Sequence, residues 1–218
     1  LAHTHIPTVW DQRGTNLARM EWHRRADGVF EFERQLPDGV VFGVQARPET
    51  NRLSMRWWMR NGSAVPVRNI RAQVCLMLGR AVGFEGQTAT NKVLEGPFAV
   101  VGNAAGDRWI ITAWQDLNRA WQNPPVPCIH SDPRLDDLAP GAMASARGWV
   151  WFHEGRELKR ELARLRATTV ELPDTGPAPI AAAVKAPIPD RLVVLTFDDS
   201  VASQYHVVRP LLKKAMWC

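Results

Sequence analysis

The sequence predicts a mainly β protein, in which an antiparallel β-sandwich is followed by a linker and then by one strand and one helix. Three observations carry this prediction. Residues 22–152 alternate short apolar segments with turn residues, and no helical pattern separates them. Residues 173–189 are rich in Pro and Ala, as is typical of a semi-rigid linker. Residues 191–197 form an apolar run of the kind found in buried parallel strands, and it ends on Asp198 and Asp199.

The sandwich strands follow from apolar and polar residues that alternate between turn signals such as Pro37-Asp38-Gly39. The proline-rich segment 124–133 is expected to be a structured loop, because Pro cannot donate a hydrogen bond to a strand ladder. A helix is expected over 154–166, where Leu residues recur at helical spacing. The predicted strands lie at residues 28–34, 40–45, 53–60, 67–78, 98–101, 109–114 and 144–152.

These elements define the predicted domain boundaries. Residues 1–170 form the sandwich with its C-terminal helix, residues 171–189 the linker, and residues 190–218 a final unit. In that unit a helix follows the strand, but the sequence ends soon afterwards. We therefore expect the last domain to be cut short, since one strand and one helix bury too little surface to fold alone.

Composition argues against two classes of partner. The 218 residues include 27 basic and 22 acidic side chains, for a net charge of +5, and the basic residues do not gather in a block. Nucleic acid binding is therefore not predicted. No apolar stretch approaches the roughly 20 residues that a membrane-spanning helix needs.

The cysteines offer little at the level of sequence. Cys75, Cys128 and Cys218 show no metal-ligand spacing such as Cys-x-x-Cys. Cys75 lies in an apolar run and is expected to be a buried thiol, although a disulfide with Cys128 stays open. His130-Ser131-Asp132 holds residue types of a catalytic triad, but sequence neighbours rarely point toward one another.

The end of the chain carries a family resemblance. Leu195-Thr-Phe-Asp-Asp-Ser, then Ser203, Tyr205 and Pro210-Leu-Leu-Lys-Lys, resembles the first motif of the polysaccharide deacetylase (NodB-like) family. The match covers about residues 190–214. Residues 53–155 look similar to uncharacterised sandwich domains that precede such deacetylase-like domains in environmental bacteria. The resemblance implies that the final unit is the first βα unit of an incomplete (β/α) deacetylase barrel.

The resemblance also implies a chemistry. The parent protein would be a hydrolase that removes N- or O-acetyl groups from an acetylated polysaccharide or peptidoglycan, outside the cytoplasm. Asp198 would be the general base and Asp199 a ligand of a divalent metal, usually zinc. Ser200 replaces the glycine of the family motif, and the family's His-x-x-x-His metal motif is missing from the sequence. We therefore expect the chain alone to be inactive and metal to bind only in a complete protein.

The alternative hypothesis is a non-catalytic β-sandwich module that binds carbohydrate or serves a structural role. The chain has 10 Trp residues, and exposed rings can stack on sugars. The residues chosen for such a surface are Trp114, Trp121, His130 and Asp132. The competing interpretation is that these rings fill the core between the sheets.

Overall fold

The computed structural model describes residues 9–15, 22–86, 88–124 and 126–167. In these residues every strand pairing is antiparallel, so the predicted mainly β, antiparallel class is confirmed. No helix in this part of the chain is long and apolar enough to cross a membrane. The elements are α1 (Val9–Gln12), β1 (His23–Arg24), β2 (Phe30–Gln35), β3 (Val40–Pro48), β4 (Arg52–Asn61), β5 (Cys75–Met77), β6 (Lys92–Glu95), β7 (Phe98–Gly102), β8 (Arg108–Trp114), β9 (Leu117–Trp121), β10 (Cys128–Pro133), β11 (Met143–Glu154) and α2 (Leu158–Ala167).

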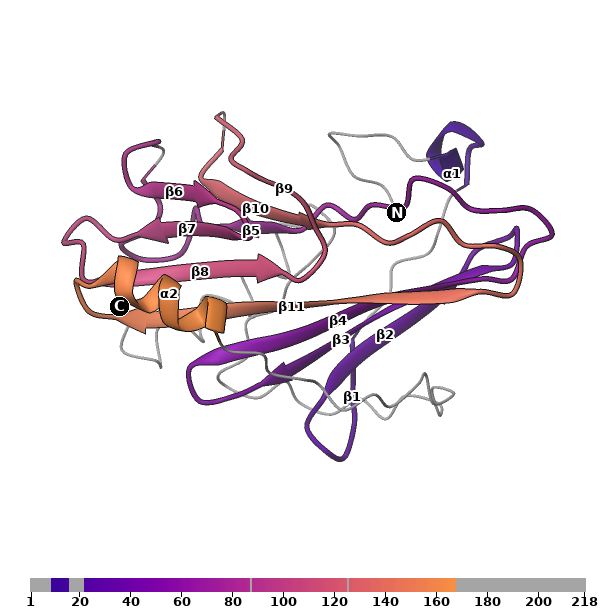
Figure 1. Ribbon diagram of the computed structural model, residues 1–218, viewed down its shortest axis with the longest axis horizontal. Coiled ribbons are helices and arrows are strands. Elements are labelled where there is room, and N and C mark those ends of the chain that lie inside the picture. The colour runs from indigo at the N-terminus through magenta and orange to yellow at the C-terminus, as the bar shows by residue number, and fades with distance from the viewer. Residues whose placement is uncertain (1–8, 16–21, 87, 125, 168–218) are drawn as a thin grey trace.

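Two sheets of unequal size make up the sandwich. The larger has 8 strands in the order β1-β2-β3-β4-β11-β8-β7-β6, and the smaller has 3 in the order β5-β10-β9. Figure 1 shows the small sheet above the half of the large sheet that holds β7 and β8. Leu76 and Ile129 of the small sheet share one buried cluster with Met55, Trp57 and Ile110 of the large sheet. The main core therefore lies between the two sheets.

The helix α2 covers part of the other face of the large sheet, in front of β8 and β11 in Figure 1. Leu162 and Leu165 are its buried residues. They pack in a second cluster with Phe98, Ile111 and Trp151. The Leu spacing of the sequence is thus the apolar stripe by which this helix attaches.

Glycine and tryptophan face each other across neighbouring strands at several points in the large sheet. The register pairs Gly43 with Trp58, Gly102 with Trp109 and Gly148 with Trp114. A Cβ atom added at Gly148 would lie 2.4 Å from Cδ2 of Trp114, and the shortest distance to the partner ring would be 2.5 Å at Gly102 and 2.6 Å at Gly43. Each indole therefore lies flat over the backbone of its partner glycine, where no other residue leaves enough room.

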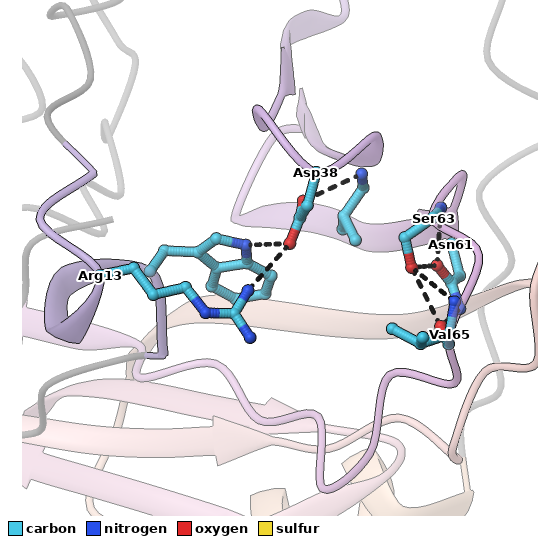
Figure 2. A network of polar contacts seen from close by, with 7 residues as sticks. Arg13, Asp38, Asn61, Ser63 and Val65 are labelled. Carbon is cyan, nitrogen blue, oxygen red and sulfur yellow. Dashed lines mark hydrogen bonds and ion pairs between the residues drawn. The ribbon is translucent and has the colours of Figure 1, made fainter.

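Two polar residues hold the connections at the edge of the sandwich (Figure 2). Asp38 accepts a 2.7 Å hydrogen bond from the Trp10 indole and lies 3.7 Å from the Arg13 guanidinium, which anchors α1. Asn61 is fully buried and donates from its amide to the carbonyls of Val65 (2.8 Å) and Leu138 (2.9 Å). The long connection after β4 is thereby fixed to the chain before β11.

The structure corrects the prediction for segment 124–133. The expected loop contains β10, the central strand of the small sheet. The prolines do not prevent this, because Pro124 and Pro127 precede the strand and Pro133 ends it at an irregularity in the ladder. The expected strand over 67–78 is reduced to β5, with isolated bridges before it.

The expected deacetylase barrel finds no support. The described residues form the sandwich and the helices α1 and α2, and residues 190–218 lie outside them. The predicted boundaries at residues 170 and 190 also lie outside the described residues, so they stay predictions.

Candidate metal centre

The side chains that combine reactive chemistry with burial lie on one face of the small sheet. Cys128, His130 and Asp132 alternate along β10, so their side chains project from the same side of the strand. The register places Cys75 of β5 opposite His130. Leu76 and Ile129, between these positions, face the main core. The reactive residues are therefore on the face that points away from the large sheet.

Two cysteines and one histidine converge on this face. One ligand atom from each of Cys75, Cys128 and His130 lies within 4.8 Å of the other two. Nε2 of His130 lies 3.3 Å from Sγ of Cys128. Cys128 and His130 are fully buried, and Cys75 is half-buried. Thiolate sulfur and imidazole nitrogen are the donors that zinc and other thiophilic metals prefer.

Asp132 lies near Nδ1 of His130, the ring nitrogen that is not directed at Cys128. Its Oδ1 lies 3.8 Å from Nδ1 of His130, which is an ion-pair distance and too long for a hydrogen bond. The carboxylate accepts hydrogen bonds from Nε of Arg119 (2.8 Å), Nε1 of Trp121 (2.7 Å) and the backbone N–H of Val74 (3.0 Å). Asp132 thus ties β9 and β10 to the residue that precedes β5. A carboxylate behind a ligating histidine fixes the ring and raises its basicity as a metal ligand.

Aromatic stacking fixes the imidazole further. The rings of Trp121 and His130 are stacked, with centroids 3.9 Å apart and an angle of 21° between their planes. The guanidinium of Arg119 lies over the same indole, 4.5 Å from its centroid. Since Trp121 is opposite His130 in the ladder, the stack is a direct result of strand register.

The electrostatics of the site favour a thiolate. The hydrogen bond from Cys75 lowers the pKa of Cys128 most, burial opposes it, and His130 lowers it further, so the pKa falls to about 4. Burial lowers the pKa of His130, but Asp132 and Cys128 more than offset this and the pKa is raised. The pKa of Asp132 is lowered, because its hydrogen bonds outweigh the effect of burial. The site is therefore prepared to present Cys128 as an anion near neutral pH.

The register also distinguishes a metal site from a disulfide. Cys75 and Cys128 are both thiols, so the disulfide left open by the sequence is not formed. Cys128 pairs with Met77 and not with Cys75, so the two cysteines are diagonal neighbours. Diagonal residues lie about 7–8 Å apart at Cα, beyond the roughly 4.4–6.8 Å that a disulfide spans. A metal ion with sulfur ligands at about 2.3 Å requires no such approach.

The structure places the other predicted residues elsewhere or leaves them untested. Trp114 is fully buried against Gly148, and His130 and Asp132 belong to the buried cluster. Trp121 is half-buried and contacts the His130 ring and the Arg119 guanidinium. A ring that stacks on sugar needs a face open to solvent, which Trp114 does not have. Asp198 and Asp199 lie outside the described residues. Their predicted roles, and the predicted divalent metal, therefore stay predictions.

Sequence reasoning placed His130 and Asp132 in a site but missed both cysteines. The sequence does contain a pattern that could have revealed Cys128, because Cys128-x-His130-x-Asp132 has the two-residue period of a strand face. It was missed because the surrounding prolines indicated a loop. The position of Cys75 could not be found from spacing, since it depends on the pairing of β5 with β10.

Comparisons with known proteins give no relative at the level of sequence. No protein-family model matches the chain, and no curated protein matches it. Among solved structures, the Slr1438 protein of Synechocystis sp. PCC 6803 is similar, with 13% identity and a TM-score of 0.41 over 61% of this chain and 66% of that one. This chain thus spans about two thirds of that protein.

Two further structures are candidate aldose 1-epimerases. The one from Escherichia coli K12 has 11% identity and a TM-score of 0.39, over 62% of this chain and 69% of that one. The one from Klebsiella pneumoniae has 12% identity and a TM-score of 0.38, over 64% of this chain and 54% of that one.

These findings correct the deacetylase prediction. No family model and no curated protein supports a deacetylase. The predicted family membership and hydrolase activity are therefore wrong. The resemblance rested on a short terminal motif, which fixes few positions and lies outside the described residues. The alternative hypothesis of a β-sandwich module agrees better with the fold of the described residues, and the carbohydrate-binding role that it includes stays a prediction.

Proposed function

We propose that this β-sandwich domain binds a thiophilic transition metal ion through Cys75, Cys128 and His130. The observation that carries the proposal is the convergence of these three ligand atoms within 4.8 Å on one face of the small sheet. Sulfur ligands in a tetrahedral zinc site lie about 3.8 Å apart, given Zn–S bonds of about 2.3 Å, so the spacing suits a shared ion.

The surroundings support the same role. Metal binding requires thiolate and a neutral imidazole nitrogen, and the lowered pKa of Cys128 reduces the free energy needed to deprotonate it. Coordination at Nε2 of His130 would leave Nδ1–H directed at Asp132, the usual partner of a ligating histidine. The ion would join β5 to β10 and so stabilise the small sheet.

Metal titration of the purified, metal-free chain tests the proposal. In a Cys218→Ser background, Co²⁺ should bind at one equivalent and give thiolate-to-cobalt absorption. Cys75→Ser, Cys128→Ser and His130→Gln should each weaken binding by roughly 100-fold or more, beyond the effect of losing an outer-shell partner. His153→Gln is the matched control, because His153 is a partly exposed histidine remote from the cluster, beside Glu161. It should leave the affinity unchanged.

Stability gives a second readout. A metal that binds only the folded chain should raise the unfolding free energy by about 4 kcal/mol at a thousandfold excess over Kd. Absorption that persists in Cys128→Ser, or an unchanged melting temperature with metal, would contradict the proposal.

A further inference from the structure

The chain just before β5 holds a glutamine, Gln73, whose amide is buried and is not accounted for by the metal ligands. We infer that Gln73 is a positioning residue of the metal centre, whose amide oxygen accepts a hydrogen bond from Nδ1–H of His130 and holds the ring with Nε2 toward the ion. This inference rests on the proposed function, and it adds a fourth residue to the three that converge there.

Strand register places Gln73 opposite Asp132. The isolated bridge between Arg71 and Arg134 continues the register in which β5 pairs with β10. Gln73 follows Arg71 by two residues, and Asp132 precedes Arg134 by two, so these two residues face each other across the ladder. The backbone N–H of Val74 donates to Oδ1 of Asp132 at 3.0 Å, which holds the two segments together at this point.

The side chain of Gln73 projects from the face that carries the cluster. Val74 and Leu76 belong to the main core between the sheets. Since side chains alternate along an extended chain, Gln73 projects from the opposite face, together with Cys75. His130 is its diagonal neighbour, and diagonal neighbours about 7–8 Å apart at Cα are within reach of a long side chain. The Gln73 amide is therefore placed to contact the imidazole.

The amide of Gln73 and Nδ1 of His130 share an unusual condition. Oε1 and Nε2 of Gln73 are both shielded from solvent, and neither has a hydrogen-bond partner within the described residues. Nδ1 of His130 is likewise shielded and unpaired there. Buried polar groups nearly always have partners, because an unpaired group loses its hydration without compensation. Nδ1–H is a donor and Oε1 is an acceptor, so one hydrogen bond between them satisfies both.

Metal binding makes this hydrogen bond necessary. When Nε2 of His130 binds an ion, Nδ1 carries the proton, and a ligating histidine almost always donates that proton to an acceptor. Oδ1 of Asp132 lies 3.8 Å from Nδ1, too far for a hydrogen bond, and it already accepts from the backbone of Val74. Asp132 therefore contributes its charge, and Gln73 contributes the acceptor.

NMR of the Zn²⁺-loaded Cys218→Ser chain, labelled with ¹⁵N-histidine, tests the contact directly. The Nδ1–H proton of His130 should be protected from exchange and should show a nuclear Overhauser effect to the side-chain methylene protons of Gln73. In Gln73→Leu the same proton should move upfield and exchange faster with solvent, because its acceptor is gone.

Co²⁺ affinity and thermal unfolding give two further readouts. Gln73→Leu should weaken Co²⁺ binding by roughly tenfold or more, as the loss of an outer-shell partner does. In the metal-free chain it should leave the melting temperature unchanged or raise it, because it removes a buried amide that has no partner. Gln45→Leu is the matched control. Gln45 is 5% exposed and donates to Glu31 at 3.0 Å, so its loss should lower the melting temperature and leave the affinity unchanged.

The outcomes separate this inference from the metal site itself. If Co²⁺ binds but the nuclear Overhauser effect to Gln73 is absent, the inference is overturned and the site stands. The same conclusion follows if Gln73→Leu changes neither the Co²⁺ affinity nor the Nδ1–H resonance, or if it lowers the metal-free melting temperature as much as Gln45→Leu does. Failure of the chain with Gln73 intact to bind Co²⁺ or Zn²⁺ overturns both proposals. Weaker binding together with a shifted resonance supports both.

Discussion

Asp132→Asn tests whether this carboxylate holds the cluster together. The side chain is 3% exposed and accepts hydrogen bonds at 2.7, 2.8 and 3.0 Å, two of them on Oδ2 and one on Oδ1. Asparagine keeps one acceptor oxygen and turns its NH₂ group toward a donor. Hydrogen bonds to a charged group contribute about 1.5–3 kcal/mol each, and the Arg119 guanidinium is 42% exposed, so it stays hydrated when its partner loses its charge. We expect the unfolding free energy to fall by about 2–4 kcal/mol.

Urea unfolding at neutral pH, followed by tryptophan fluorescence, measures this loss. Asp137→Asn is the matched control, because Asp137 accepts from the backbone of Asn69 at 2.9 Å and lies 3.4 Å from the Arg68 guanidinium. Its side chain is 53% exposed, so the same substitution should cost no more than about 1 kcal/mol. Equal losses in the two variants would refute the reasoning, since burial would then not strengthen the contacts of Asp132.

Two further predictions concern packing and protonation. Gly148→Ala would place Cβ 2.4 Å from the Trp114 ring, so we expect a loss of about 1–3 kcal/mol in thermal unfolding, whereas Gly79→Ala, whose nearest contact is 3.3 Å away, should lose little. In the metal-free chain, the thiolate absorbance of Cys128 should disappear with a midpoint near pH 4, well below the ordinary 9.0 of a thiol. Between pH 4 and 9 the Cys128 thiol is ionised in the folded chain and protonated in the unfolded chain, so its contribution to the unfolding free energy is lost as the pH falls toward 4. The raised pKa of His130 acts in the opposite direction, because its contribution is lost as the pH rises. A midpoint near 9 would show that the thiol is not activated.

The sequence alone predicted much of the fold through local pattern. Short apolar segments between turn residues identified the segments that form β2, β3, β4, β7, β8 and β11, because such segments are typical of strands. The stripe of Leu158, Leu162 and Leu165 identified α2, although the helix begins later than expected. The prediction of a loop at β10 was wrong. A Pro residue cannot donate a backbone hydrogen bond to the ladder, but it does not prevent a strand that begins just after it.

The sequence by itself determined that the chain has two cysteines and a Cys-x-His-x-Asp alternation in its sandwich region. Only the tertiary structure brought Cys75 opposite His130, placed the Trp121 ring on the imidazole and buried the cluster. The physical reason is that pairing between strands is long-range. The periodicity of one strand decides which of its side chains share a face, but the register with its neighbours decides what those side chains meet.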